Sequence, residues 1–151
     1  MAIKVPRAPL PKSPAVSAAM RGNKKKDTRP ELIVRRMAHR LGARYRLHVR
    51  GLPGRPDMVF ASRRLVVFVH GCFWHSHDPA QCTLKRAPAP AGEYWAAKLA
   101  RNIERDCDLR KQLEGLGWRV EIFWECETRD PETLSARFRK LLASLPDALT
   151  P

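Results

Sequence analysis

Residues 65–82 read LVVFVHGCFWHSHDPAQC, a short apolar run that leads directly into a loop with two cysteines and two histidines. The apolar run, rich in valine, predicts a buried strand. Zinc prefers thiolate and imidazole ligands in a tetrahedron, and a structural zinc site commonly combines a local ligand cluster with a distant ligand. Cys72, His77 and Cys82 can supply the cluster, so this stretch predicts a strand that ends at a metal-binding loop.

The fourth ligand is expected far along the chain. Cys126 ends the run WRVEIFWEC, residues 118–126, which predicts a second strand that can lie beside residues 65–70. In a reducing compartment, cysteine near histidine favours a metal site over disulfides. The alternative is that these cysteines are ordinary small residues buried at strand ends. Cys107 stays outside the set and is assigned to packing.

The rest of the chain predicts three helices and two further strands. Thr28 and Glu31 form a capping-box pattern before LIVRRMAHRL, which predicts a helix over residues 28–41. Strands are expected over 44–49 and 57–60, the latter antiparallel to 65–70 across the turn ASRR. Helices are expected over 93–117 and 131–145. The first of these places six residues near one face: Trp95, Leu99, Ile103, Asp106, Leu113 and Leu116.

The order αβββαβα predicts an α/β fold with a mixed central sheet flanked by helices. A chain of 151 residues has room for one domain, which we assign to residues 28–145. Residues 1–27, rich in Pro, Ala and Lys, are expected to be a basic flexible arm, and 146–151 a short tail. No stretch is apolar enough for a membrane span or a signal peptide, so a cytoplasmic protein is expected.

The charge of the chain indicates a polyanionic partner. The 29 Lys and Arg exceed the 15 Asp and Glu, which gives a net charge of +14. The basic arm and the pairs Arg35-Arg36 and Arg63-Arg64 are expected to contact DNA phosphates, which set position and affinity rather than sequence choice.

Two aspartates are candidates for phosphodiester chemistry. Asp57 opens a predicted strand after Pro56, where nucleases of the PD-(D/E)xK type place a Mg²⁺ ligand, although it can also be a turn residue. Asp106 falls on the apolar helix face, where a carboxylate needs a partner. A histidine is one candidate, which Asp106 would orient as a general base, and a surface cation such as Arg105 or Arg110 is the other.

Four segments together resemble the very short patch repair endonucleases, which are bacterial DNA mismatch endonucleases. They are LPGRPD (52–57), HGCFWHSH (70–77), EYWAAKLARNIERD (93–106) and LGWRVEIFWEC (116–126), in the family's order. The resemblance covers roughly residues 20–142. It implies a restriction-endonuclease-like fold and an enzyme that nicks duplex DNA 5′ of the thymine in a T·G mismatch arising from 5-methylcytosine deamination.

The same resemblance implies roles for individual residues. Asp57 and the backbone carbonyl of Val69 would bind Mg²⁺, which explains the lack of a second acid on that strand; a threonine is common in the family at position 69, but a carbonyl ligand does not depend on the side chain. His75 would be the general base. Four further residues would assist: Asp106 by orienting His75, Glu31 and His70 by supporting the water and the scissile phosphate, and Met20 by reaching across the DNA from the arm. Glu31 has a second interpretation, because it can simply complete the helix cap.

The resemblance also assigns Cys72, His77, Cys82 and Cys126 to a structural zinc. One departure from the family pattern is the insertion DPAQ between His77 and Cys82, which leaves open a longer zinc loop or a change of ligand to His75. Phe73 and Trp74 with Trp95 would wedge into the base stack beside the mismatch, where unstacking costs least. The alternative for these rings is ordinary core packing.

The expected partner is duplex DNA with a T·G mismatch, bound by a monomer. Mismatch-repair proteins and a cytosine methyltransferase are the candidate protein partners. Two rival functions remain: a related restriction-type nuclease without mismatch preference, and a non-catalytic zinc-containing DNA-binding module. Binding alone does not need Asp57, His75 and Asp106 together, which argues against the second rival.

Overall fold

The protein is described by a computed structural model that covers residues 3–8, 10, 14, 26–78, 80–83 and 92–145. The helices are α2 (Arg29–Arg40), α3 (Glu93–Gly115) and α4 (Pro131–Ser144), and the strands are β1 (Met58–Phe60), β2 (Leu65–His70) and β3 (Arg119–Trp124). Two 3-10 helices, η1 (Ala61–Arg63) and η2 (Glu125–Arg129), follow β1 and β3. Met20 and most of the basic arm lie outside the described residues.

The three strands form one mixed sheet in the order β1-β2-β3, which confirms the expected α/β class. β1 pairs antiparallel with β2 through the short η1 turn, and β2 pairs parallel with β3. In the parallel pair His70 lies opposite Trp124, the last residue of each strand. Because parallel strands end at the same edge of a sheet, the loop after β2 and the helix η2 after β3 begin side by side.

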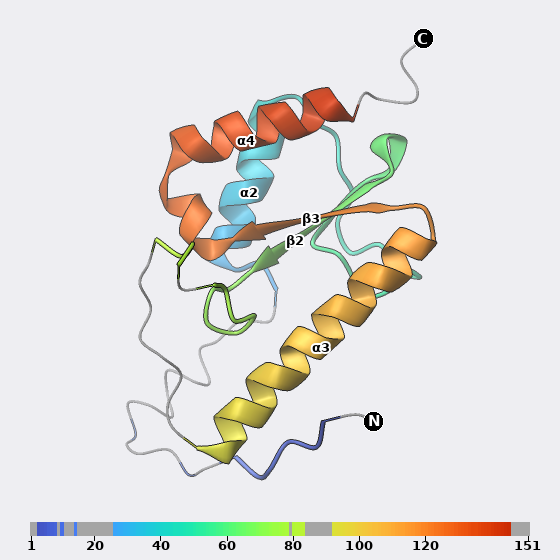
Figure 1. Cartoon of the computed structure of the whole chain (residues 1–151). Helices are drawn as coiled ribbons and strands as arrows, with labels where there is room; N and C mark the ends of the chain where they lie inside the picture. Colours follow the sequence, from blue (N-terminus) through green and yellow to red (C-terminus); the bar gives the residue numbers. More distant parts are fainter. Residues whose placement is uncertain are drawn as a thin grey trace.

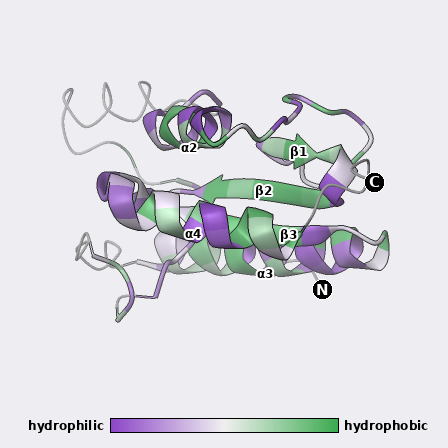
Figure 2. Ribbon diagram, turned by 90° about the horizontal axis from the view of Figure 1, so that it is seen from above, coloured by the Kyte–Doolittle hydropathy of each residue, from purple (hydrophilic) through white to green (hydrophobic). Residues whose placement is uncertain are grey.

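Helices cover both faces of the sheet (Figure 1), and the strands between them are largely apolar (Figure 2). On one face α2 and α4 pack against the sheet in the main core, whose largest fully buried side chains include Met58, Phe60, Phe123 and Phe138. On the other face Leu113 of α3 packs in a smaller core built from alternate strand residues. Because side chains alternate between the two faces along β1 and β2, each strand contributes residues to both cores.

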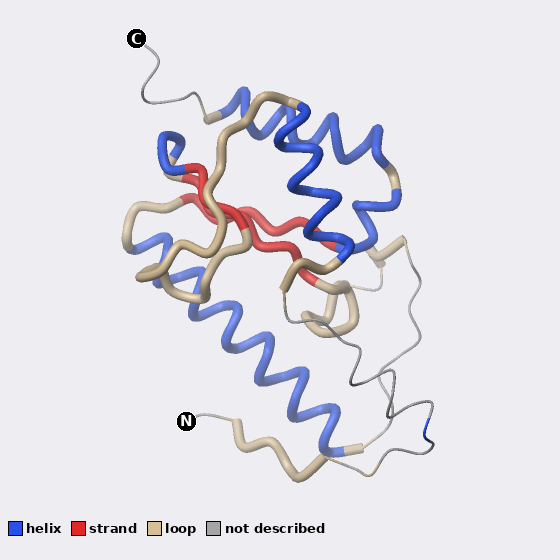
Figure 3. Tube along the Cα trace, turned by 180° about the vertical axis from the view of Figure 1, so that it is seen from behind, coloured by secondary structure: helices blue, strands red, loops and turns tan. Residues whose placement is uncertain are grey.

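Helix α3 is far longer than the strands it covers, as Figure 3 makes clear. Its 23 residues span roughly 34 Å, whereas a six-residue strand spans roughly 20 Å. The C-terminal half packs on the sheet, and the N-terminal half extends past the edge where β2 and β3 end. None of the described helices is long and apolar enough to cross a membrane.

Two expected strands are wrong in part. Residues 44–49 make only an isolated bridge, Arg46 opposite Val59, because His48 takes a left-handed φ of 54° that interrupts the extended backbone. Strand β3 ends at Trp124, so Cys126 lies in η2 and not on a strand.

The predicted inner face of α3 is also wrong at two positions. Ile103 and Leu116 are 51% and 54% exposed. Asn102 and Leu109 are half-buried instead, because the helix contacts loops at these positions: Asn102 at the Trp74 carbonyl and Leu109 at Gly54.

Besides its apolar core contacts, the last helix is linked to the sheet by Arg137. Asp130 caps the start of α4 by accepting from the Thr133 amide. One turn further on, the Arg137 guanidinium lies 4.2 Å over the Phe123 ring and donates to the Glu127 carboxylate at 2.6 Å and to the Ile122 carbonyl at 2.8 Å. Arg137 therefore joins α4, β3 and η2, the element that carries Cys126.

We expect Arg137→Ala to lower the free energy of unfolding by about 1–2 kcal/mol, since it removes charge-assisted hydrogen bonds and a cation-π contact at a partly exposed site. Urea denaturation followed by circular dichroism measures the loss. Arg139→Ala is the matched control on the same helix, where the side chain is exposed, and should change stability by less than about 0.5 kcal/mol. Equal effects of the two variants would contradict the anchoring role of Arg137.

Candidate active site and metal centre

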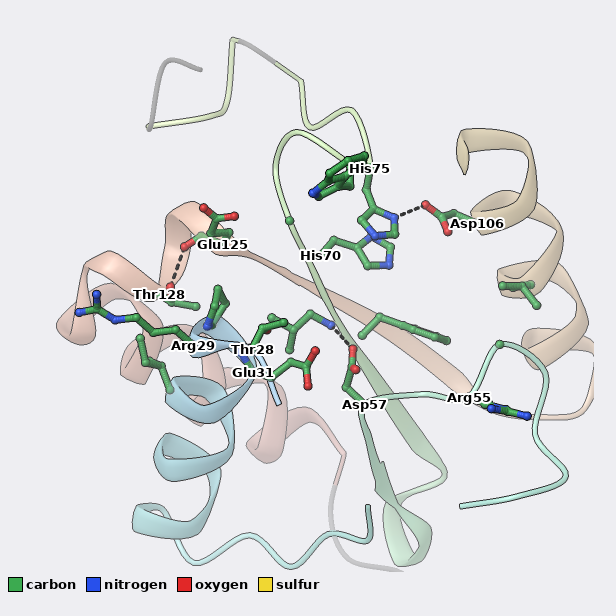
Figure 4. A pocket seen from close by; sticks show the side chains of 18 of the residues that line it. Thr28, Arg29, Glu31, Arg55, Asp57, His70, His75, Asp106, Glu125 and Thr128 are labelled. Carbon is green, nitrogen blue, oxygen red and sulfur yellow. Dashed lines mark hydrogen bonds and ion pairs between the residues drawn. The ribbon is translucent and has the colours of Figure 1, made fainter. Parts of the chain in front are cut away.

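An open pocket of about 1290 Å³ lies where β2 and β3 end. Its walls come from the start of α2, the loop before β1, the end of β2, the middle of α3 and η2. Five of the residues predicted for the catalytic site line it (Figure 4), as does Val69, the predicted carbonyl ligand. Those five are Glu31, Asp57, His70, His75 and Asp106. Residues separated by 75 positions in the sequence are thus gathered at one edge of the sheet.

The side chain of Asp57, the residue just before β1, is held in a fixed orientation. Its Oδ2 accepts a hydrogen bond from the Val69 amide at 2.7 Å, while Oδ1 accepts none from the described part of the chain. In a strand the N–H and C=O of one residue point to the same side, so the Val69 carbonyl faces the same edge as this carboxylate. Burial raises the pKa of Asp57 to about 6; the Val69 amide opposes the shift and nearby Glu31 adds to it.

Glu31 fulfils its helix-cap role and also faces Asp57 (Figure 4). Thr28 accepts from the Glu31 amide at 3.4 Å, and the Glu31 Oε2 accepts from the Asp27 amide at 2.9 Å and from Arg35 at 3.1 Å. Its Oε1 takes no hydrogen bond from any described residue, although the side chain is only 6% exposed. Both interpretations of Glu31 are therefore compatible with its position.

His75 is paired with Asp106, not with solvent. The His75 Nδ1 lies 2.5 Å from the Asp106 Oδ2, while the alternative partner Arg105 is 4.0 Å from the other carboxylate oxygen. Burial opposes ionisation of Asp106, but the hydrogen bond and charge of His75 hold its pKa below the ordinary value. An ionised carboxylate only accepts, so Nδ1 carries the proton and Nε2 is left as an acceptor.

His70 lies against His75 with the two rings stacked, 3.7 Å between centroids and 9° between planes. Burial, and then the proximity of His75, lower the pKa of His70 to about 4. His70 is therefore neutral near pH 7 and offers one donor and one acceptor.

A glycine allows close packing between the loop that leads to Asp57 and helix α3. Gly54 has a φ of +73°, and a Cβ at this position would lie 2.9 Å from the Leu109 Cδ1. Leu109 is one turn beyond Asp106 on α3. The glycine in LPGRPD therefore lets this loop approach the helix that orients His75.

Beside this pocket, four further side chains form a group that could hold a metal ion, called the metal-binding group below. The ligand atoms of Cys72, His77, Cys82 and Cys126 all lie within 4.8 Å of one another. The sulfur atoms of a tetrahedral zinc site with bonds near 2.3 Å lie roughly 3.8 Å apart, so the spacing of this group is compatible with zinc. The change of ligand to His75 does not occur, because His75 belongs to the cluster with His70 and Asp106.

The register of the sheet explains how these four residues meet. Cys72 and Cys126 each follow the paired residues His70 and Trp124 by two positions, and the Cys126 amide donates to the Cys72 sulfur at 3.4 Å. The His77 ring stacks on Trp124 at 4.1 Å with its Nδ1 3.5 Å from the Cys126 sulfur. All three cysteines are buried; burial raises the pKa of Cys72 to about 12, an effect that a bound divalent cation would reverse.

The predicted DNA wedge is an aromatic cluster outside both cores. Phe73, Trp74 and Trp95 lie with ring centroids 5.0 to 6.1 Å apart, and all three are half-buried. None belongs to the buried clusters of the sheet, so ordinary core packing is excluded for them. Met20, the fourth predicted DNA contact, lies outside the described residues.

Three neighbours of this cluster were missed from the sequence. The Lys98 ammonium lies 5.0 to 5.5 Å from the ring centroids of Trp74, Tyr94 and Trp95, and 3.0 Å from the Tyr94 hydroxyl. Asn102 donates to the Trp74 carbonyl at 2.9 Å. A spacing of four residues could have identified them, because positions 94, 98, 102 and 106 lie along one side of α3.

The arginine pairs predicted to contact phosphates are largely engaged within the protein. Arg35 is buried and paired with Asp27 at 2.7 Å and with Glu31. Arg63 donates to the Leu142 and Leu145 carbonyls, and Arg64 donates to the Leu116 carbonyl at 2.8 Å. These three guanidinium groups thus already have partners within the protein, and Arg36 alone of the four is exposed; their contact with phosphates stays a prediction.

Comparisons with known proteins agree with one another. Residues 12–81 match the family model described as DNA mismatch endonuclease Vsr. The chain is 44% identical over 111 residues to the DNA mismatch endonuclease Vsr of Escherichia coli strain K12, which covers 72% of this chain and 69% of that protein. It is 48% identical over 117 residues to the Type II nicking enzyme V.XorIIP of Xanthomonas oryzae pv. oryzae, covering 78% and 84%. It is 35% identical over 124 residues to the Type II nicking enzyme V.NmeAIP of Neisseria meningitidis, covering 82% and 86%.

We expect Cys126→Ser to lose bound zinc and to melt at a lower temperature, since a structural zinc contributes directly to folding. Elemental analysis of the purified protein and thermal denaturation are the measurements. Cys107→Ser is the matched control, because Cys107 is exposed on α3 and away from the group. A wild-type protein without zinc, or equal zinc content in both variants, would exclude this site.

Proposed function

The chain belongs to the Vsr family of DNA mismatch endonucleases, and from this premise we propose that it nicks duplex DNA 5′ of the thymine in T·G mismatches left by deamination of 5-methylcytosine. The nick would start very short patch repair. The observation that carries the proposal is one pocket that holds the oriented Asp57 carboxylate beside the His75–Asp106 pair. The mixed sheet between helices is compatible with the restriction-endonuclease-like fold that we assign to it.

The donor set of the pocket fits a hard divalent cation. Asp57 and the Val69 carbonyl would hold Mg²⁺, because carboxylate and carbonyl oxygens are the ligands that Mg²⁺ prefers. Asp57 and Glu31 face each other with one free oxygen each, a buried pair of carboxylates that a cation would stabilise. When bound, Mg²⁺ supplies charge neutralisation at the scissile phosphate.

His75 is proposed as the general base. Its Nδ1–H is held by Asp106, so Nε2 can take a proton from the attacking water. The pairing fixes the tautomer and the ring plane before substrate binds and stabilises the imidazolium that forms. Stacking on His70 limits ring rotation further.

His70 and Glu31 are proposed to support the reacting groups. The neutral His70 ring can donate to a phosphate oxygen, and its low pKa prevents it from competing for the proton that His75 takes. The free Glu31 oxygen can accept from the attacking water while the cap to α2 keeps the other oxygen in place.

The aromatic cluster supports mismatch selection. Phe73 and Trp74 lie on the loop between the zinc group and the proposed base, with Trp95 packed against them. Inserting rings between base pairs costs a few kcal/mol of stacking, which is lower beside a mismatch. A loop held by zinc would keep its position while the rings insert between base pairs. The structural metal would in this way contribute to specificity.

The two rivals differ in observable ways. A nuclease without mismatch preference would nick T·G and T·A duplexes equally. A zinc-containing binding module would bind both and nick neither, yet it has no use for an aspartate that pairs with a histidine inside a pocket. The relatives named as nicking enzymes favour cleavage of one strand.

The proposal is tested by a nicking assay on one T·G duplex and its T·A control, with Mg²⁺ and with EDTA. We expect nicking of the T·G duplex alone and only with Mg²⁺. Asp57→Asn should abolish it while folding and zinc content stay unchanged, because the amide keeps an acceptor for the Val69 amide but carries no charge. Full activity of this variant would remove the proposed magnesium site.

We expect His75→Ala to lower the single-turnover nicking rate by roughly 10²- to 10⁴-fold, the usual contribution of a general base, with little change in DNA affinity. Asp106→Asn should lower the rate in the same direction by disturbing the tautomer. His39→Ala, at an exposed position of α2, is the control and should match the wild type. Equal losses of rate and affinity in His75→Ala would indicate a recognition role instead.

A further inference from the structure

The described arginines fall into two groups that the sequence does not distinguish. Those of the first group are engaged with carboxylates or carbonyls of other elements, as Arg35, Arg63, Arg64 and Arg137 are. Arg29, Arg55 and Arg129 belong to the second group: each is exposed, and its side chain makes no ion pair or hydrogen bond within the described residues. Unpaired guanidinium groups at fixed positions are available to an external anion.

These three arginines line the active-site pocket together with Arg105, whereas other exposed arginines such as Arg36 and Arg139 do not. They come from four different elements: Arg29 opens α2, Arg55 lies in the loop before β1, Arg105 is on α3 and Arg129 ends η2. Arg105 is 59% exposed, and its Nε is 4.0 Å from Asp106, too far for a strong pair. The pocket thus gathers four exposed guanidinium groups that are distant in sequence.

These cations flank the carboxylates. In Figure 4, Arg29 and Arg55 lie on opposite sides of Asp57, and Arg29 is on the side of Thr128, the residue before Arg129. Arg105 lies on the other flank, beside Asp106. The pocket therefore has acidic groups at its centre and two arginines towards each end.

We propose that Arg29 and Arg129 on one flank, and Arg55 and Arg105 on the other, bind backbone phosphates of the cleaved strand on either side of the scissile phosphate. The inference rests on the proposed nuclease function. Guanidinium forks match phosphate oxygens in two parallel hydrogen bonds. Such contacts fix the register of the strand over Asp57 without selecting its sequence.

The test is DNA affinity as a function of salt, measured by fluorescence anisotropy in EDTA on a T·G duplex and its T·A control. Each of Arg29→Gln, Arg55→Gln, Arg105→Gln and Arg129→Gln should reduce the slope of log K against log salt by about 0.9. The loss of affinity between about 50 and 200 mM salt should then be roughly threefold smaller than for the wild type. The reduction should be the same on both duplexes.

Arg139→Gln, on α4 and outside the pocket, is the control and should keep the wild-type slope. Thermal melting verifies that each variant is folded. Wild-type slopes in all four pocket variants, with normal T·G nicking by the wild type, would overturn the inference and leave the proposed function standing. Reduced slopes in a protein that never nicks would support the phosphate contacts and remove the nuclease function.

Discussion

The parallel pairing of β2 with β3 is the constraint on which both halves of the site depend. It ends the two strands at the same edge, with His70 opposite Trp124. From there one strand continues into the loop with Cys72 and the other into η2 with Cys126, so the metal-binding group closes across the pair. The same edge presents Val69 to Asp57, brought in by the antiparallel β1. A slip of one residue in this register would separate both groups at once.

The pocket combines groups that would be unstable together in a simple hydrophobic interior. Two carboxylates, a neutral imidazole and a carboxylate-paired imidazole share one cavity, and burial shifts two of their pKa values in opposite directions. The apolar contacts of the main core and the Arg137 contacts of α4 offset this cost. The framework thus tolerates a polar centre because its apolar contacts lie elsewhere.

Features that depend on neighbouring residues could be predicted from the sequence, whereas most tertiary contacts could not. The Thr28 cap, the Asp130–Pro131 start of α4 and the valine-rich β2 are determined by neighbouring residues, so they were predictable. The grouping of Cys72, His77, Cys82 and Cys126 in space was also predictable, because thiols and imidazoles at such spacing commonly share one metal. The break at His48, the exposure of Ile103 and the engagement of Arg63 with distant carbonyls depend on which surface folds against which. A pattern of a few residues does not determine such tertiary contacts.

Helix α3 carries Asp106, the partner of the proposed base, and Trp95 of the aromatic cluster on one continuous helix. Asp106 and Trp95 are eleven residues apart, a separation of roughly 16 Å along the helix axis. An inserted or deleted residue between them would turn one end by about 100° relative to the other. In the proposed reaction, the geometry of α3 would therefore set the distance between the recognised base pair and the broken bond. That distance would be the same at every position of the protein along the DNA.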